Sequence, residues 1–242
     1  MAFSHGTAAR VWLDGFGASC SLNEVSIEAD IDTAETTVLC DTAKTYIPGL
    51  EDGTFEASGF FTSDPDAPAE TFEAWLNARK RTIFPTAFHP EGADAVGDPG
   101  YMLNGMLSSY GVETTVEDAA TIELEIQTSN GIERGLMLHP HATETADDVS
   151  TELDNGADSA NGASALLSVS SISGTTPELD VIVQHSDDNA VWVPLMTFST
   201  VDTTSSEYLT ATGAVERYVR VSWTLTGTDD PEATFNVIFR RR

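Results

Sequence analysis

The chain has 242 residues, and its 39 Asp and Glu residues against 11 Lys and Arg residues give a formal net charge of −28. Such a field repels nucleic acid phosphates and anionic lipid head groups, which excludes a conventional DNA-binding or membrane-surface protein. Hydrophobic residues make up 40% of the chain, enough for one large or two modest domains, which excludes wholesale disorder. The charge is also typical of a hydrated surface in high salt, so a halophilic virus or host is an alternative explanation of it.

Up to about residue 137, apolar and polar residues alternate with a period of two, the pattern of strands that bury one face. The clearest runs are 24–32 and 122–127, where apolar residues alternate with mostly acidic ones. Between 66 and 81 the period changes, because Phe72, Trp75 and Leu76 share one helical face and basic residues follow them. This predicts one amphipathic helix packed on a sheet. Further strands are predicted over 11–13, 36–39, 54–61, 82–88 and 101–112.

Residues 140–162 are small, polar and acidic with little periodicity, which predicts a linker or an extended approach strand. The sequence therefore predicts a mainly β chain: an antiparallel β-sandwich or barrel with one flanking α-helix over 1–139, and an Ig-like all-β sandwich over 163–242. In the second part, short strands separated by turns are expected over 166–172, 179–185, 191–198, 206–210, 218–225 and 234–240.

The motifs that usually carry catalysis are missing. Gly15-Phe16-Gly17 begins like a dinucleotide loop but lacks the third glycine, and the Walker, nucleophile-elbow and His-Glu-x-x-His patterns do not occur. His139 and His141 flank a proline, and two solvated imidazoles are expected there in place of a metal site. The basic run 240–242 is expected to be a solvated tail. We therefore expect no enzymatic activity, no cofactor and no metal.

Two cysteines, Cys20 and Cys40, are too few for a disulfide framework in a chain of this length, so reduced and packed thiols are expected. No basic segment followed by an apolar stretch opens the sequence, and no run of about eighteen apolar residues occurs. A protein made in a cytoplasm and not inserted in a membrane is expected.

One predicted loop is apolar where loops are usually polar. Residues 41–53 join two predicted strands, and Pro48-Gly49 and Asp52-Gly53 argue against a smooth strand throughout this segment. Tyr46, Ile47 and Leu50 then require burial, either against their own core or against another subunit.

At this loop the sequence resembles a known family. Residues 45–61, reading TYIPGLEDGTFEASGFF, are preceded by an alternating strand and followed by the amphipathic helix, and they are similar to tail tube (major tail) proteins of long-tailed, siphovirus-like phages or archaeal viruses. The resemblance covers residues 1 to about 137, and 47–53 is its most specific part. The C-terminal half, with 172–181, 184–188 and 217–223, looks like a β-sandwich domain appended to such proteins.

The resemblance implies a structural protein of the virion tail, assembled in the host cytoplasm. Its subunits would form hexameric rings that stack into a hollow tube, through which the viral DNA passes transiently and without specific binding. Implied partners are further copies of the chain and other tail proteins, namely the tape measure, tail terminator and distal tail proteins, while the C-terminal domain decorates the tube exterior. Inter-ring stacking is assigned to the long loop, here Lys44, Tyr46, Ile47, Pro48, Gly49, Leu50 and Asp52.

The negative charge suits such a tube, because a lumen lined with carboxylates repels phosphate and lets DNA slide. For each candidate set, a solvated outer face is the alternative. The candidate lining residues are Glu24, Glu28 and Asp30, or Glu123 and Glu125.

The chief rival function is recognition, in which a virion-surface adhesion protein binds host glycans through its C-terminal sandwich. The remaining rival is a secreted or capsid-surface β-protein that forms no tube. Trp192, Tyr208 and Trp223 are the aromatic candidates for that role, and at least one of them is expected in the core.

Overall fold

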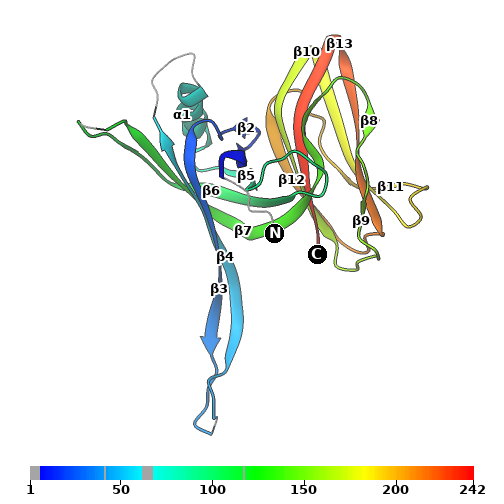
Figure 1. Ribbon diagram of the computed structural model, residues 1–242. Coiled ribbons are helices and arrows are strands. Elements are labelled where there is room, and N and C mark those ends of the chain that lie inside the picture. The colour runs from blue at the N-terminus through cyan, green and yellow to red at the C-terminus, as the bar shows by residue number, and fades with distance from the viewer. Residues whose placement is uncertain (1–5, 41, 62–67, 117) are drawn as a thin grey trace. The chain divides into compact units, whose positions relative to one another are not determined.

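The computed structural model describes residues 6–40, 42–61, 68–116 and 118–242. These residues form a mainly β chain with one α-helix, α1 (Pro68–Arg79), and one short 3-10 helix, η1 (Gly6–Ala8) (Figure 1). The predicted fold class is confirmed, and the helix expected over 66–81 corresponds to α1; positions 66 and 67 lie outside the described residues, as does the side chain of Phe72.

The strands account for most of the described chain, and every strand pair with an assigned register is antiparallel. Residues 36–39, predicted as a strand, instead belong to the connection between β3 and β4. The strands are β1 (Arg10–Leu13), β2 (Phe16–Gly17), β3 (Leu22–Glu35), β4 (Tyr46–Phe60), β5 (Ile83–His89), β6 (Pro99–Glu113), β7 (Thr121–Glu144), β8 (Asp148–Val149), β9 (Leu153–Asp154), β10 (Ala163–Ser186), β11 (Val193–Thr197), β12 (Ser205–Ala211) and β13 (Tyr218–Arg241).

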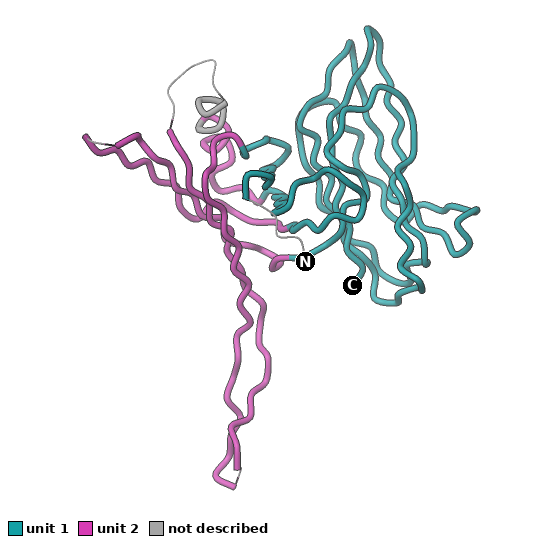
Figure 2. The backbone as a smooth tube through the Cα atoms, viewed as in Figure 1, with its two compact units in different colours: residues 1–19, 84–102, 133–242 teal, residues 20–83, 103–132 magenta. Residues whose placement is uncertain are grey.

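The chain divides into two compact units, shown in different colours in Figure 2. Unit 1 comprises residues 1–19, 84–102 and 133–242, and unit 2 comprises 20–83 and 103–132, so that β6 and β7 contribute to both. This division differs from the two domains predicted over 1–139 and 163–242. The boundaries of those domains stay a prediction. Within 140–162, residues 140–144 complete β7, while β8 and β9 pair with β13.

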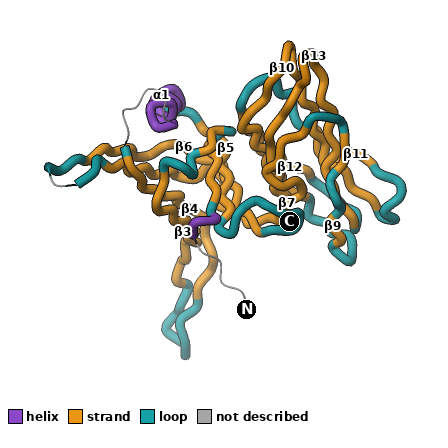
Figure 3. The backbone as a smooth tube through the Cα atoms, turned by 45° about the horizontal axis from the view of Figure 1, so that its top comes forward, coloured by secondary structure: helices purple, strands orange, loops and turns teal. Residues whose placement is uncertain are grey.

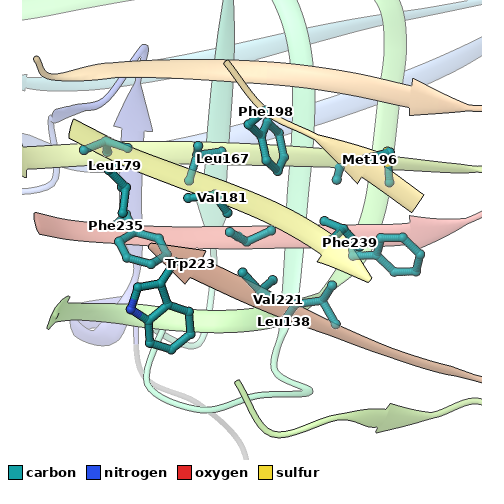
Figure 4. Close-up of a cluster of buried hydrophobic side chains, with 14 of the residues drawn as sticks. Leu138, Leu167, Leu179, Val181, Met196, Phe198, Val221, Trp223, Phe235 and Phe239 are labelled. Atoms are coloured by element: carbon teal, nitrogen blue, oxygen red, sulfur yellow. The ribbon is translucent and has the colours of Figure 1, made fainter. Parts of the chain in front are cut away.

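Two long strands, β10 and β13, supply much of the core of unit 1, and each of them was predicted as two shorter strands. The separate strands expected over 166–172 and 179–185 form one strand, β10, and those over 218–225 and 234–240 form β13. The two pair over their whole length, with register shifts near Gly174, where φ is +120°. Glycine permits that conformation, so the paired strands bend where a break was predicted. Figure 4 shows side chains from β10 and β13, including Val181, Val221 and Phe235, packed in one cluster.

Unit 2 contains a sheet in which β4 is the middle strand. Its residues 54–59 pair with β3 on one side, and its residues 54–60 pair with residues 121–127 of β7 on the other. Phe55 and Ala57 alternate with exposed Glu56, and Leu124 and Ile126 opposite them are also buried. This alternation buries one face of the sheet and leaves the other in contact with water.

Candidate functional site

The candidate lining residues lie together on one face of the sheet in unit 2. In an antiparallel pair, directly opposed residues project from the same face. Glu24 is opposite Ser58, which is opposite Glu123, and two residues along the strands Glu56 is opposite Glu125. The two predicted sets, which the sequence offered as alternatives, are therefore neighbours on one surface.

The same face continues along β3 toward the turn of the β3–β4 hairpin, where Glu28 is opposite Thr54 and Asp30 is opposite Asp52. Residues 24–30, 52–58 and 121–127 contain no Lys or Arg, so these three strand segments bring no compensating cation. We call this surface the acidic face, consisting of Glu24, Glu28, Asp30, Asp52, Glu56, Glu123 and Glu125.

Part of the acidic face is hollowed. A depression of about 340 Å³ is lined by Glu24, Glu56, Glu123 and Glu125 among others. Neutral donors hold some of the carboxylates in place: Ser108 donates to Glu125 over 3.0 Å, and the amide of Gln127 donates to Asp52 over 2.5 Å. Glu56 was missed in the sequence, although its place between apolar Phe55 and Ala57 was a usable signal. The result is a concentrated negative surface on a rigid sheet.

Residues 46–53 are not a loop, and that part of the prediction is wrong. They form the outer half of β4 and pair with β3, from Tyr46 opposite Glu35 to Gly53 opposite Ala29. Figure 3 shows strand over most of the length of this hairpin, and in Figure 2 it is the long projection of unit 2. We call residues 29–52 the hairpin arm.

A β-bulge accommodates the glycine that argued against a smooth strand. Ile31 is opposite Glu51 and Thr33 is opposite Pro48, so two residues of β4, Gly49 and Leu50, oppose the single residue Asp32. A Cβ atom at Gly49 would lie 2.9 Å from the Cβ of Asp32, so the tight pairing requires glycine. Bulges absorb one extra residue and increase local twist, and strand pairing resumes beyond this one.

The hairpin arm exposes large apolar side chains. Its described residues, 29–40 and 42–52, are all exposed, and β4 has β7 as a second neighbour only from Thr54 onward. An isolated two-stranded ribbon in water is marginally stable, because it has no face to bury. The large apolar side chains that it exposes are those of Ile31 (60%), Val38 (56%), Leu39 (110%), Tyr46 (52%), Ile47 (54%) and Leu50 (81%).

The predicted stacking residues are distributed along the arm. Lys44 lies near its tip and forms an ion pair with Glu35 at 3.0 Å, while the hydroxyls of Thr36 and Thr45 lie 3.1 Å apart. Tyr46, Ile47, Pro48, Gly49 and Leu50 form the outer strand. Asp52 belongs to the acidic face, opposite Asp30.

The aromatic candidates for glycan binding are mostly in contact with protein. Trp223 is buried and donates its indole N–H to the carbonyl of Ala146 over 2.9 Å, so it is the expected core member. Tyr208 is half-buried and donates its hydroxyl to Glu133 over 2.6 Å. Trp192 lies under the guanidinium of Arg220, at 4.1 Å from the ring centre. No exposed aromatic platform is formed by these three residues.

Several polar residues are placed differently from their predictions. His139 is buried and stacks on Phe235 at 4.2 Å, so it is not a solvated imidazole, and burial lowers its pKa. Arg241 is not part of a solvated tail, because it lies in β13 and donates to three backbone carbonyls. Cys20 and Cys40 are exposed thiols, not packed ones.

In the part of the chain that the structure describes, no three His, Cys, Asp or Glu side chains are arranged to hold a metal ion. Across the same residues, no helix has the length and apolar character needed to cross a membrane.

No protein-family model matches the sequence, and no curated protein matches it. Among solved structures, the tail of an empty gene transfer agent particle is similar over 54% of this chain and 98% of its own, with 14% identity and a TM-score of 0.43. The phage SPP1 tail tube is similar over 55% and 78%, with 12% identity and a TM-score of 0.43. The Dit protein of SPP1, described as a hub adsorption apparatus of phages that infect Gram-positive bacteria, is similar over 96% and 99%, with 12% identity and a TM-score of 0.42. At these identities and TM-scores, none of the alignments assigns the chain to a family.

Proposed function

We propose that this chain is a structural subunit of a viral tail tube, in which hexameric rings stack through the hairpin arm and the acidic face lines the channel for DNA. Residues 1–139 supply the tube domain in this proposal, and the sandwich at 163–242 decorates the exterior. Its partners are further copies of the chain and the tape measure, tail terminator and distal tail proteins.

The observation that carries the proposal is the exposed hairpin arm. A ribbon of two strands that exposes Ile31, Ile47 and Leu50 gains stability when a partner covers it. Full burial of a side chain of this size contributes about 1.5–3 kcal/mol, so a few such contacts repeated around a ring favour association substantially. The outer strand of the arm overlaps the segment 45–61, whose sequence resembles tail tube proteins, and this resemblance gives the proposal a second support.

The acidic face supports the second part of the proposal. Carboxylates repel the phosphates of passing DNA and offer no cation that would hold it. A channel that conducts DNA requires weak binding along its whole length, and a sheet face that presents seven carboxylates and no Lys or Arg meets that requirement.

The arm is tested by replacing Ile47 and Leu50 together with Asp. The purified variant should remain folded, because both side chains are already exposed, but it should form no tubes in electron micrographs under conditions where the unaltered chain does. Val191→Asp is the matched control, since Val191 is 68% exposed on the sandwich. Tubes of normal length from the double variant would exclude the arm as the stacking element.

The channel is tested by neutralising three members of the acidic face, with Glu24→Gln, Glu123→Gln and Glu125→Gln. Tubes should assemble normally, whereas virions carrying the variant should eject DNA more slowly because phosphate is repelled less strongly along the channel. Ejection kinetics measured in vitro decide the point. The charge-matched control removes three exposed carboxylates of the sandwich, with Glu178→Gln, Asp202→Asn and Glu232→Gln. Unchanged ejection would place this face outside the channel.

A further inference from the structure

We propose that a groove on unit 1, lined by arginine and apolar side chains, is the receptor for the hairpin arm of a second copy of this chain. This inference rests on the proposed function and adds the surface on which the arm docks. The groove has a volume of about 300 Å³ and is formed by β7, β9 and β13. The lining residues used here are Arg134, Leu136, Leu153, Phe239, Arg240 and Arg241, and we call the site the arginine groove.

Charge distribution singles out this groove. With 39 acidic and 11 basic residues, most surfaces of two copies repel one another. Five of the basic residues gather at this end of unit 1: Arg134, Arg240 and Arg241 line the groove, Arg217 binds Asp154 in the groove wall, and Arg242 pairs with Glu133 beside Arg134. A second copy therefore finds an attractive surface here.

Two of the groove cations form no ion pair with a carboxylate among the described residues. Arg241 donates to the carbonyls of Val215, Glu216 and Arg217, at 2.6–2.9 Å, which uses its N–H groups without cancelling its charge. Arg134 is exposed and forms no ion pair in the described part of the chain. Two carboxylates beside them are already engaged, Asp154 by Arg217 at 2.6 Å and Glu133 by Arg242 at 2.9 Å, while Asp158 attracts Arg241 without forming an ion pair with it. The groove thus retains positive charge for an external anion.

The hairpin arm offers the matching pattern. Around its bulge, exposed Ile31 and Leu50 lie next to Asp30, Asp32 and Glu51, and none of these three carboxylates pairs with Lys or Arg within the described residues. Apolar side chains flanked by carboxylates complement a groove in which Leu136, Leu153 and Phe239 lie beside arginines. The arm of a second copy would then bury Leu50 against the apolar wall while Asp32, which is opposite Leu50 across the bulge and projects from the same face, reaches Arg134.

Proximity is tested by disulfide cross-linking between two variants of the full chain. Both carry Cys20→Ser and Cys40→Ser; one adds Leu50→Cys and the other, enlarged by a tag, adds Leu136→Cys. After mixing and mild oxidation, the mixed dimer should be at least about fivefold more abundant than with Val149→Cys in place of Leu136→Cys. Val149 is a matched control, because it is 42% exposed on unit 1 and Leu136 is 41% exposed.

Charge reversal provides the second readout. Arg134→Glu should raise the protein concentration required for tube formation by about tenfold, and combining it with Asp32→Arg should restore the original value. If the unaltered chain assembles but the Leu136→Cys cross-link does not exceed the Val149→Cys control, the arm docks elsewhere and this inference is wrong while the proposed function stands. If neither assembly nor cross-linking occurs at any concentration, both are wrong.

Discussion

Glu133 holds the C-terminal end of β13 in unit 1, and its replacement by Gln should lower the stability of that unit. One carboxylate oxygen of Glu133 accepts hydrogen bonds from the hydroxyls of Ser164 and Tyr208, and the other accepts from Arg242 at 3.0 Å, with Arg240 at 3.7 Å. The side chain is only 13% exposed, so water does not readily replace these donors. All four donors point toward a single anion.

The Gln side chain has one acceptor oxygen and one donor nitrogen. Whichever way the amide of Glu133→Gln turns, its nitrogen faces either the two hydroxyls or Arg242, so one group of donors loses its acceptor. Hydrogen bonds to charged groups contribute about 1.5–3 kcal/mol, and we therefore expect a loss of roughly 2–3 kcal/mol at pH 7. Glu232→Gln, at an exposed position of β13, should change stability by less than about 0.5 kcal/mol.

The pH dependence provides the sharper test of this reasoning. Burial alone would raise the pKa of Glu133, but the hydrogen bonds from Ser164 and Tyr208 and the charge of Arg242 outweigh it and hold the pKa below its usual value. A lowered folded-state pKa means that the stabilisation is present above the unfolded-state pKa and is lost as the pH falls through the folded-state pKa. Urea denaturation monitored by tryptophan fluorescence should show the difference between the two proteins shrinking from pH 7 to pH 3.5. A difference that stays constant over this range would refute the role of the charge.

Three further predictions concern the packing of unit 1. Gly15→Ala should lower the melting temperature of unit 1 by more than Gly156→Ala does. Both glycines have a positive φ near +77°, so the backbone strain is similar. A Cβ atom at Gly15, however, would lie 2.5 Å from the carbonyl oxygen of Val169, whereas a Cβ atom at Gly156 would have no heavy atom beyond its chain neighbours within 4 Å of it. Burial, and then the charge of His141, lowers the pKa of His89 to about 4, so unit 1 should lose roughly 3 kcal/mol as the pH falls from 7 to 4, and His89→Gln should flatten this slope in urea titrations. Phe235→Ala should cost about 3–5 kcal/mol in the same assay, since Phe235 is fully buried in the core, and a cost under about 1 kcal/mol would contradict the packing.

Much of the strand structure could be predicted from the sequence because alternating burial leaves a direct pattern in it. The runs around Ile27 and Leu124 read correctly since each lies in a sheet with one wet face. The segment 46–53 did not, because Pro48-Gly49 and Asp52-Gly53 have the composition of turns, and only the pairing partner Asp32 shows that the chain forms a bulge there. Local composition does not show whether a glycine will lie in a turn or in a bulge paired with a neighbouring strand.

The candidate site was likewise predictable within each strand but not across strands. Each acidic set was visible as an alternation within its own strand, but their union on one face depends on the position of β4 between β3 and β7, which is a long-range property. The burial of Arg241 could not be anticipated either, since its carbonyl acceptors at 215–217 form a site only after β13 has folded. Charged groups near the end of a sequence are ordinarily solvated, and here tertiary contacts override that tendency.

The hairpin arm also bears on how such a chain stays dispersed before assembly. Among the described residues, β3 pairs only with β4, and residues 46–53 of β4 pair only with β3. Both long edges of the ribbon therefore present unpaired backbone groups. Edges of this kind template indiscriminate strand addition between identical molecules. Asp30, Asp32 and Glu51 line these edges, and their mutual repulsion opposes edge-to-edge pairing of two arms. The carboxylates of the arm thereby oppose aggregation through its edges, and in the proposed assembly the same charges favour a surface of opposite sign.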